Sequence, residues 1–277
     1  MTMANPVHAA AELLSNTDLS PGIFRLDFSL RNFPEPKGAC AGRFFMIKPQ
    51  RSSVFLGRAI SIADWRNHEP AADRTGQVSF LIALRGRGTQ ELHDMQPGEH
   101  AELTGPLGNA WADFLPQAPS GGKPVALIGG GIGLAPLAAL LHEDFRAPSG
   151  LGFHLYAGFK TAPTLEEQGA LLTNAARNSC TTVIASEDGT LGKKGRIPDF
   201  LQPESYAAVC VCGPEAMMKA VAKRCFAAKT PCFISTERRM ACGVGACLGC
   251  TVKTHKGNQR CCADGPIFDA KDVIFDD

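Results

Sequence analysis

Four cysteines near the C-terminus carry the clearest chemical signal in this chain of 277 residues. Three of them, Cys242, Cys247 and Cys250, follow one another with the spacing C-x4-C-x2-C. That spacing is typical of plant-type ferredoxins, in which a fourth cysteine further along the chain completes the thiolates around a [2Fe–2S] cluster. Either of two adjacent residues, Cys261 and Cys262, could supply the fourth thiolate. Because such a cluster carries one electron at a time, the pattern predicts electron transfer.

A four-cysteine zinc site is the alternative for the same residues. Zinc sites usually pair two short C-x2-4-C units across a longer spacer, whereas here three cysteines fall within nine positions and the last stands alone. The intervening glycines, Gly243, Gly245 and Gly249, let the backbone approach sulfur closely and present N–H groups to it. The spacing therefore favours an iron–sulfur cluster over zinc.

A glycine-rich turn between a predicted strand and a predicted helix is the second chemical signal. The apolar strand at 125–128 runs into the sequence GGGIGLAP, which contains Gly129, Gly130, Gly131 and Gly133. Exposed N–H groups at such a turn, with a helix beginning beside them, can bind a pyrophosphate. The run departs from the strict G-x-G-x-x-G pattern, because a leucine stands where the third glycine belongs. A tight turn without a ligand is the alternative.

The run Cys212-Gly213-Pro214 closes another predicted strand, at 207–212. Ligands of open α/β sheets bind beyond the carboxyl ends of the strands, so this run and the glycine-rich turn are expected at the same edge. The alternative for Cys212 is a small buried residue, and the two interpretations are compatible.

The N-terminal part carries weaker signals. Arg58 could hold a phosphate and Ser61 could address a polar ring atom, although a solvated arginine at a strand start is the alternative. Gly88-Thr89 is typical of a strand-to-helix turn with Thr89 near the N-cap, and 105–109 (GPLGN) of an ordinary turn. No G-x-S-x-G or H-E-x-x-H pattern occurs in the chain. Nucleotide loops without acid–base machinery favour redox chemistry carried by cofactors.

The elements that must position these residues change character along the chain. Up to about residue 115 the sequence is β-rich, with alternation at 24–30 and 78–84 and frequent Gly/Pro turns, which predicts an antiparallel barrel. Further short strands are expected at 44–47, 58–62 and 101–103, and an exposed hairpin excursion at 63–77.

A Pro/Gly-rich linker at 116–124 separates this part from an α/β pattern. Strands alternating with helices predict a parallel sheet covered on both faces. The expected strands are 125–128, 153–157, 181–185 and 207–212, and the expected helices 136–142, 164–176 and 214–228. A short strand at 232–235 leads into the cysteine module. We therefore expect three domains, at 1–118, 123–230 and 231–277.

Composition excludes several function classes. The net charge is +1 without a basic run, which argues against nucleic acid or an anionic membrane as a partner. The first residues lack a basic region followed by an apolar one, and no apolar run reaches 18 residues, so neither a signal peptide nor a transmembrane helix is expected. Eleven cysteines in such a chain predict a reducing, cytoplasmic compartment.

These motifs, in this order, resemble the ferredoxin–NADP reductase superfamily. More narrowly, ERRMACGVGAC at 237–247 and CADGPIF at 262–268 resemble the electron-transfer subunits of class 1B dihydroorotate dehydrogenases, and the resemblance spans nearly the whole chain. It implies FAD in the barrel and NAD in the α/β domain. It also implies a [2Fe–2S] cluster facing an FMN-containing catalytic subunit, in a heterotetramer that oxidises dihydroorotate in pyrimidine biosynthesis.

The resemblance also implies roles for single residues. The family's last cysteine precedes x-D-G-P, which selects Cys262 over Cys261 as the fourth ligand. Segments 237–240 and 263–268 are implied to face the partner. The implied flavin contacts are Arg58, Ala59, Ile60, Ser61, Leu81, Ile82, Ala83, Gly88, Thr89, Gly105, Gly108 and Asn109. The implied nicotinamide-nucleotide contacts are Gly129, Gly130, Gly131, Gly133, Cys212, Gly213 and Pro214.

Some positions depart from the family pattern. Ala59 stands where the family has proline, and Ile82 where an aromatic residue is common. The core motifs survive, so these departures bear mainly on the identity of the partner. Three alternatives are also open: another NAD(P)H-linked iron–sulfur flavoprotein of the ferredoxin or sulfide type, a redox-sensing module that is not an enzyme, and a zinc-stabilised domain. The choice between NAD and NADP is open as well, because no acidic partner for the ribose can be placed from the sequence.

Overall fold

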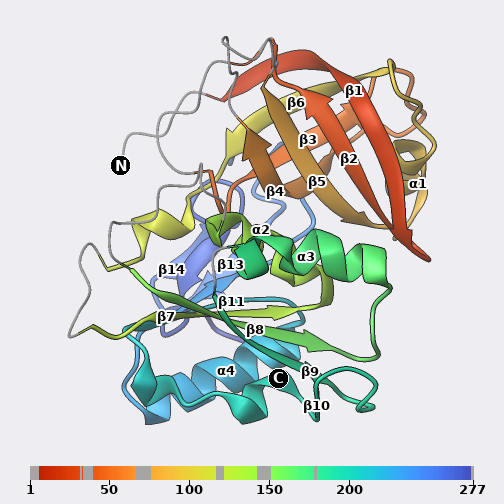
Figure 1. The fold of residues 1–277 in the computed structure, drawn as a ribbon. Coiled ribbons are helices and arrows are strands. Elements are labelled where there is room, and N and C mark those ends of the chain that lie inside the picture. Colours follow the sequence, from red (N-terminus) through yellow and green to blue (C-terminus); the bar gives the residue numbers. More distant parts are fainter. Residues whose placement is uncertain are drawn as a thin grey trace.

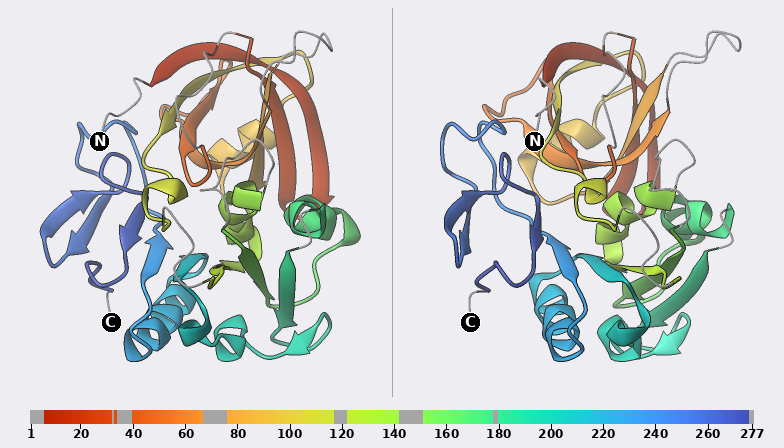
Figure 2. Two further views of the ribbon diagram at one scale, coloured as in Figure 1. Left: turned by 60° about the vertical axis from the view of Figure 1, so that its left-hand side comes forward. Right: turned by 90° about the vertical axis from the view of Figure 1, so that its left-hand side faces the viewer.

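The computed structural model describes residues 6–31, 33, 40–66, 76–116, 122–141, 151–177 and 180–275. A closed antiparallel barrel lies against a seven-stranded, mostly parallel sheet, and a small C-terminal module packs beside both (Figure 1, Figure 2). This arrangement confirms the fold class predicted from the sequence. Most of the predicted linker, 117–121, falls outside the described residues.

Six strands form the barrel in the order β1-β2-β5-β4-β3-β6, and β6 closes it by pairing with β1. Phe24, Phe28, Phe45 and Phe80 fill its interior. The strand bounds are β1 (Val7–Ser20), β2 (Ile23–Ser29), β3 (Phe44–Pro49), β4 (Arg58–Arg66), β5 (Gln77–Ala83) and β6 (His100–Leu107), with helix α1 (Arg87–His93) after β5 and the 3-10 turn η2 (Trp111–Asp113) after β6.

The prediction of an exposed excursion from residue 63 is wrong for its first residues. β4 continues to Arg66, and Ala63, Asp64 and Trp65 are buried. They are covered because β4 pairs with β5 through Trp65 and because helix α2 (Ala135–Ala138) packs on β4. Residues 67–75 of the predicted excursion lie outside the described part of the chain.

The second sheet has the strand order β10-β9-β8-β7-β11-β12-β15, and all its pairings are parallel except β12 with β15. Helix α3 (Leu165–Arg177) lies with α2 between the sheet and the barrel, and α4 (Glu215–Ala227) covers the opposite face (Figure 1). The strands are β7 (Val125–Gly130), β8 (Phe153–Phe159), β9 (Thr181–Ser186), β10 (Lys193–Lys194), β11 (Ala208–Cys212), β12 (Cys232–Ser235) and β15 (Ile267–Asp269). The remaining 3-10 turns are η3 (Gly131–Leu134), η4 (Ala139–Leu141), η5 (Ile197–Phe200) and η6 (Pro203–Ser205).

The helix expected at 136–142 is shorter than predicted. Its α-helical part is the single turn α2, flanked by the 3-10 turns η3 and η4, and residues 142–150 lie outside the described chain. Every residue from Leu134 to Leu141 is buried, because this segment is apolar on all sides and lies between barrel and sheet. The helix dipole next to the glycines is therefore small, and only backbone N–H groups remain as the predicted pyrophosphate contacts.

The C-terminal module is built onto both larger parts. Its hairpin, β13 (Thr251–Thr254) with β14 (Gly257–Arg260), follows the cysteine loop, and β15 then returns to the sheet beside β12. Strand β3 is buried on both faces because Phe45 and Ile47 point into the barrel, whereas Phe44 and Met46 pack in the cluster of residues that contains Cys250 and Cys262. The three domain boundaries stay a prediction. That prediction groups β12 and β15 with the cysteine module, whereas in the structure these two strands complete the seven-stranded sheet.

Among the described helices, none combines the length and the apolar character that crossing a bilayer requires.

Candidate functional site

The four predicted ligand cysteines share one backbone hydrogen-bonding pattern. Each of their sulfurs accepts a backbone N–H at 3.1–3.4 Å: from Gly245 to Cys262, from Cys247 to Cys242, from Cys262 to Cys250 and from Gly249 to Cys247. Donors of this kind stabilise ligating thiolates and orient them. Backbone N–H groups of glycines in the loop are among these donors, which partly explains why glycines lie between the cysteines.

The two adjacent cysteines, Cys261 and Cys262, have different surroundings. The Sγ of Cys261 is fully buried and donates to the carbonyl of Thr236 at 3.3 Å, and burial raises the pKa of this thiol to about 11. Burial, together with the neighbouring Cys250 thiol, raises the pKa of Cys262 to about 12. Cys262 therefore faces the other predicted ligands, whereas Cys261 is bonded to the end of β12. These contacts support Cys262 as the fourth ligand.

The surroundings of Cys242 lower the pKa of its thiol. Burial acts to raise its pKa, but N–H groups from Cys247, Val244 and Ala246 outweigh burial and lower the pKa to about 6. The thiolate, which is the form that binds metal, is therefore favoured near neutral pH.

The donor set fits an iron–sulfur cluster. It consists of soft thiols alone, held on a glycine-rich loop with backbone N–H groups directed at the sulfurs. Within the described residues, no three histidine, cysteine or acidic side chains meet closely enough to hold a single metal ion. The Cys242 and Cys247 thiols are within hydrogen-bonding reach of each other, as are those of Cys250 and Cys262.

The cysteine loop touches the barrel beside the strand that is predicted to contact a flavin. Gly243 has a φ of +70° and packs on β3 so closely that a Cβ would lie 2.6 Å from Met46 Cγ. Met46 in turn pairs with Ala59 of β4. The first four residues of β4, Arg58 to Ser61, are only partly buried, whereas Ile62 is fully buried. A partly open strand thus runs next to the predicted cluster ligands.

Arg58, Gly88 and Thr89 come together at one end of β4. The Arg58 guanidinium lies directly over Gly88, where any side chain would collide with it, and its Nη1 donates to the carbonyl of Leu56 at 2.9 Å. The Thr89 hydroxyl accepts from the N–H of Arg85 and donates to the carbonyl of Gly86. Thr89 therefore closes the turn before α1, as the sequence predicts, and Arg58 is the charged group at this point.

The side chains of β5, a strand next to β4, alternate between the inside and the outside of the barrel. Ile82 is 1% exposed and points into the barrel core, whereas Leu81 and Ala83 are on the opposite face of β5. A flavin outside the barrel could meet the side chains of Leu81 and Ala83, and Ile82 only through its backbone.

The glycine-rich turn and the Cys212 run pack against one another at the carboxyl edge of the sheet. A Cβ on Gly133 would lie 2.6 Å from the carbonyl oxygen of Cys212, and one on Gly130 would lie 2.8 Å from Pro214 Cδ. Cys212 is buried, and burial followed by the nearby Glu237 raises the pKa of its thiol to about 12, so it is a neutral thiol. The structure thus brings the predicted nucleotide residues into one place.

A cavity of about 960 Å³ opens at this edge and is bounded by all three parts of the chain. Gly130–Gly133 and Gly213–Met218 line it from the sheet, Arg85 from the barrel, and Glu237 and Arg238 from the segment before the cysteine loop. Its size suits a dinucleotide half or a nicotinamide ring with its ribose.

Several residues in this cavity are absent from the predicted nucleotide contacts, and one of them, Glu237, is implied to face the partner. Arg85, Glu187 and Glu237 line it, and they follow directly after or close to the ends of β5, β9 and β12. The rule that ligands lie beyond the carboxyl ends of strands could have identified Glu187 and Glu237. The same rule could not have identified Arg85, because this residue follows a strand of the barrel and not a strand of the parallel sheet.

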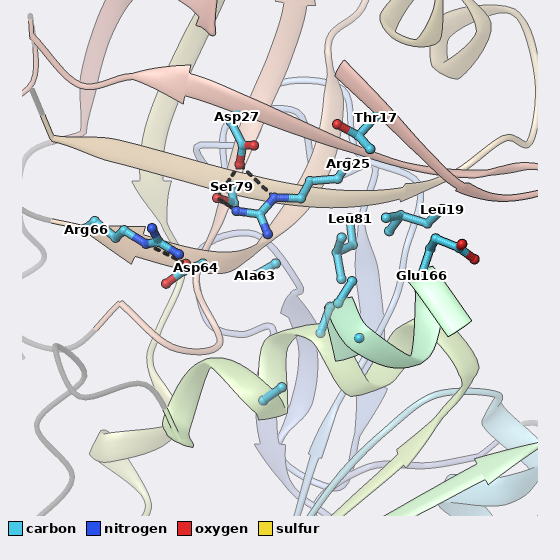
Figure 3. Close-up of a pocket in the computed structure, with 14 residues that line it drawn as sticks. Thr17, Leu19, Arg25, Asp27, Ala63, Asp64, Arg66, Ser79, Leu81 and Glu166 are labelled. Atoms are coloured by element: carbon cyan, nitrogen blue, oxygen red, sulfur yellow. Dashed lines mark hydrogen bonds and ion pairs between the residues drawn. The ribbon is translucent and has the colours of Figure 1, made fainter. Parts of the chain in front are cut away.

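A second cavity, of about 410 Å³, lies between the outer wall of the barrel and helices α2 and α3 (Figure 3). Asp27 accepts hydrogen bonds from Arg25, Ser15 and Ser79 there, and Arg66 pairs with Asp64. Burial acts to raise the pKa of Asp27, but the Arg25 charge and the two hydroxyls lower it. The charges pair with one another, which is typical of a polar network between two packed layers.

One predicted interface segment is buried within this chain. Gly265 to Phe268 are covered by the barrel and by the sheet edge, because β15 pairs with β12 and residue 265 accepts from Asn109. The implication that all of 263–268 faces a partner is therefore wrong. In the cysteine loop the exposed residues are 246–249 together with Val244, where Val244 is 50% and Leu248 63% exposed.

Comparison with known proteins gives a consistent result over the whole chain. Residues 237–274 match the iron-sulfur cluster binding domain of dihydroorotate dehydrogenase B, and 127–223 match the oxidoreductase NAD-binding domain. The dihydroorotate dehydrogenase B (NAD(+)) electron transfer subunit of Clostridium acetobutylicum is 34% identical over 98% of both chains. The subunit of the same name from Clostridium perfringens is 37% identical over 85% of this chain and 87% of its own.

Solved structures show the same fold at lower identity. An NADH-dependent reduced ferredoxin-NADP oxidoreductase superposes with a TM-score of 0.78 at 21% identity, covering 96% of this chain and 90% of its own. A ferredoxin NADP+ reductase from Neisseria gonorrhoeae with bound FAD and NADP gives a TM-score of 0.59 at 20% identity, covering 81% and 92%.

Proposed function

The chain belongs to the family of dihydroorotate dehydrogenase B electron transfer subunits, and on this premise we propose that it passes electrons from dihydroorotate oxidation in a partner subunit to NAD+. It is an oxidoreductase subunit, and its cofactors are FAD, an iron–sulfur cluster and NAD. When bound, the flavin connects hydride transfer with single-electron transfer, and the cluster carries single electrons.

The observation that carries this proposal is the contact between the cysteine loop and the barrel. Gly243, next to the ligand Cys242, packs on Met46, which pairs with Ala59 in the predicted flavin strand. The nucleotide cavity is bounded by the same barrel through Arg85 and by the cysteine module through Glu237. These contacts support a nucleotide site, a flavin strand and a thiolate loop that lie next to one another in this chain.

The chain's own residues bind and orient in this proposal. Cys242, Cys247, Cys250 and Cys262 hold the cluster, and Arg58 over Gly88 holds a flavin phosphate. The N–H groups of the turn 129–133 hold the pyrophosphate of NAD. The backbone carbonyl of Cys212 packs against this turn and positions it, while the buried Cys212 thiol does not line the cavity.

The partner that we propose is an FMN-containing dihydroorotate dehydrogenase subunit, in a heterotetramer. The exposed side of the cysteine loop, with Val244 and Leu248 beside the surface ligand Cys247, is the surface that we propose it covers. The surface around the exposed ligand Cys247 is where the cluster would come closest to a partner, and electron transfer needs a short distance.

The test is purification of the chain under strictly anaerobic conditions, alone and co-expressed with its predicted partner. The proposal expects a brown protein that contains flavin, iron and sulfide, reduces an artificial acceptor with NADH in preference to NADPH, and gains dihydroorotate-dependent NAD+ reduction only with the FMN subunit. A sample with cofactors but no turnover of NADH would instead support a redox sensor. A colourless zinc protein would overturn the proposal.

A further inference from the structure

The family resemblance implies a flavin contact for Asn109. In the structure its side chain forms hydrogen bonds with the cysteine module instead. Its Nδ2 donates to the carbonyl oxygens of Ile267 at 2.9 Å and Asp264 at 3.2 Å, and its Oδ1 accepts from the N–H of Ile267 at 3.0 Å. An amide side chain has two N–H donors and one carbonyl oxygen. Both donors of Asn109 and its acceptor are therefore directed at the loop that follows Cys262.

The backbone around Asn109 serves the same contact. The Asn109 N–H donates to the carbonyl of Gly265 at 2.7 Å. Gly108, with a φ of +77°, approaches so closely that a Cβ would lie 2.6 Å from Pro266 Cδ and 2.8 Å from the oxygen of Gly265. The end of β6 and the loop 264–267 are thus joined by four hydrogen bonds and one close glycine contact, across more than 150 residues of sequence.

The loop that Asn109 holds is directly connected to the predicted cluster ligands. The Asp264 carboxylate accepts from the backbone N–H of Arg260 at 2.8 Å and from its Nε and Nη2 at 2.9 Å. Arg260 Nη1 reaches the carbonyl of Gly245 at 3.4 Å, and the Gly245 N–H donates to Cys262 Sγ at 3.1 Å. Asn109 therefore lies at the start of a bonded path that ends on a ligand sulfur.

The same loop is fixed from its other side by the sheet. Thr236, the residue after β12, donates its N–H and its hydroxyl to the carbonyl of Pro266, at 2.9 Å and 3.2 Å. The loop 264–267 is thus held between sheet and barrel, and Asn109 is its polar side-chain anchor to the barrel. Removing the anchor would leave three polar backbone groups partly buried and unpaired, so the loop would shift to find other partners.

We infer that Asn109 is a positioning residue: it latches the cysteine module to the barrel and so sets the distance between the cluster and the flavin strand. The functional importance of that distance rests on the proposed function. The attachment of the module to the barrel rests on the hydrogen bonds described above. Electron tunnelling falls steeply with distance, so a loosened latch slows transfer between flavin and cluster. We expect it to change flavin binding and the hydride step little, because the side-chain donors and the acceptor of Asn109 are all directed at the loop 264–267.

The test compares Asn109→Ala and Asn109→Asp with Asn16→Ala in the reconstituted full chain. Asn16 is a matched control, because its Nδ2 also donates to two backbone carbonyls, of His93 and Met95 at 2.7 and 2.9 Å, but inside the barrel alone. Asn109→Asp keeps the acceptor for the Ile267 N–H, but it replaces the amide donor by a carboxylate oxygen that repels the two carbonyl oxygens.

Two measurements decide the outcome. Hydrogen exchange at the Ile267 amide should become roughly ten- to a hundredfold faster in Asn109→Ala, since each lost bond is worth a factor of about five. It should rise less in Asn109→Asp, which keeps the acceptor for that amide, and stay unchanged in Asn16→Ala. Stopped-flow absorbance should show slower cluster reduction after NADH addition, with the FAD dissociation constant and the rate of flavin reduction within about twofold of wild type.

A weakened FAD affinity with unchanged exchange at Ile267 would overturn the inference and return Asn109 to a flavin contact. If Asn109→Ala does not fold, Asn109→Asp carries the same two measurements. If the wild-type chain holds no flavin or cluster, the proposed function fails, while the exchange data still decide whether the latch exists.

Discussion

Replacing Gly133 by alanine tests whether the glycine-rich turn and the Cys212 run form one nucleotide site. The new Cβ would lie 2.6 Å from the oxygen and 2.8 Å from the carbonyl carbon of Cys212, where ordinary contact begins at 3.4 Å. The obstacles are backbone atoms of a central strand, which cannot rotate away. The turn must therefore move outward by about 0.8 Å, at a cost of roughly 1–3 kcal/mol for an overpacked contact.

The displacement has two measurable consequences. The midpoint of thermal unfolding should fall by about 2–4 °C for each kcal/mol lost in a chain of this size. The affinity for NAD+ should fall roughly tenfold or more, because the N–H groups of the turn no longer converge on the pyrophosphate. Calorimetry of unfolding and a fluorescence titration with NAD+ measure these two quantities.

Gly152→Ala is the matched control at the opposite edge of the same sheet. A Cβ there would meet Pro124 Cβ at 3.6 Å, an ordinary contact, and its φ lies outside the left-handed region. This variant should bind NAD+ as the wild type does. If Gly133→Ala keeps both its stability and its affinity for NAD+, the turn does not bind the nucleotide in the way proposed here.

Three further changes test separate parts of the structure. Cys262→Ser should abolish the electron paramagnetic resonance signal of the reduced cluster, whereas Cys261→Ser should keep it, because the Cys261 thiol bonds to Thr236 instead; the reverse result would exchange the two roles. Asp27→Asn should cost about 1–3 kcal/mol of unfolding free energy at neutral pH. Because the folded pKa of Asp27 is lowered, its contribution is present above the ordinary value of 3.8 and is lost as the pH falls below it, so denaturant titrations of the two proteins should converge in acid. Gly169→Ala, in α3, should raise the unfolding free energy by about 0.4–1 kcal/mol, since the added methyl meets no atom within 4 Å and alanine favours the helix; a loss of stability in urea would show that the site is more crowded than described.

The parts of the fold that local pattern determines could be predicted from the sequence. The predicted strand at 207–212 is β11 (Ala208–Cys212), and the helix at 214–228 is α4 (Glu215–Ala227). Both are continuous runs whose apolar period matches one element and whose ends carry glycine or proline. The cysteine spacing is equally local, and it led directly to the metal module that the family comparison confirms.

β1 shows where local pattern is insufficient. Its sequence, VHAAAELLSNTDLS, is rich in alanine and polar residues and lacks a clear alternation, so it gives no strand signal. It is a strand because β2 and β6 both offer it hydrogen-bonding edges, and without it the barrel would not close. Strand formation here is a property of the sheet and not of the segment.

Asn109 shows the same limit at the site. In sequence it belongs to a loop after a barrel strand, and resemblance to flavoproteins assigns such a loop to the flavin. Its hydrogen bonds go instead to residues 264 and 267, which no local pattern can connect with it. The loop at the end of the barrel that we propose binds flavin is therefore also bonded to the cysteine module, so both proposed redox sites are attached to the same loop. A chain that has to keep an electron-transfer distance constant while its surface binds a partner gains from such an arrangement, because a shift of the barrel end moves both sites together.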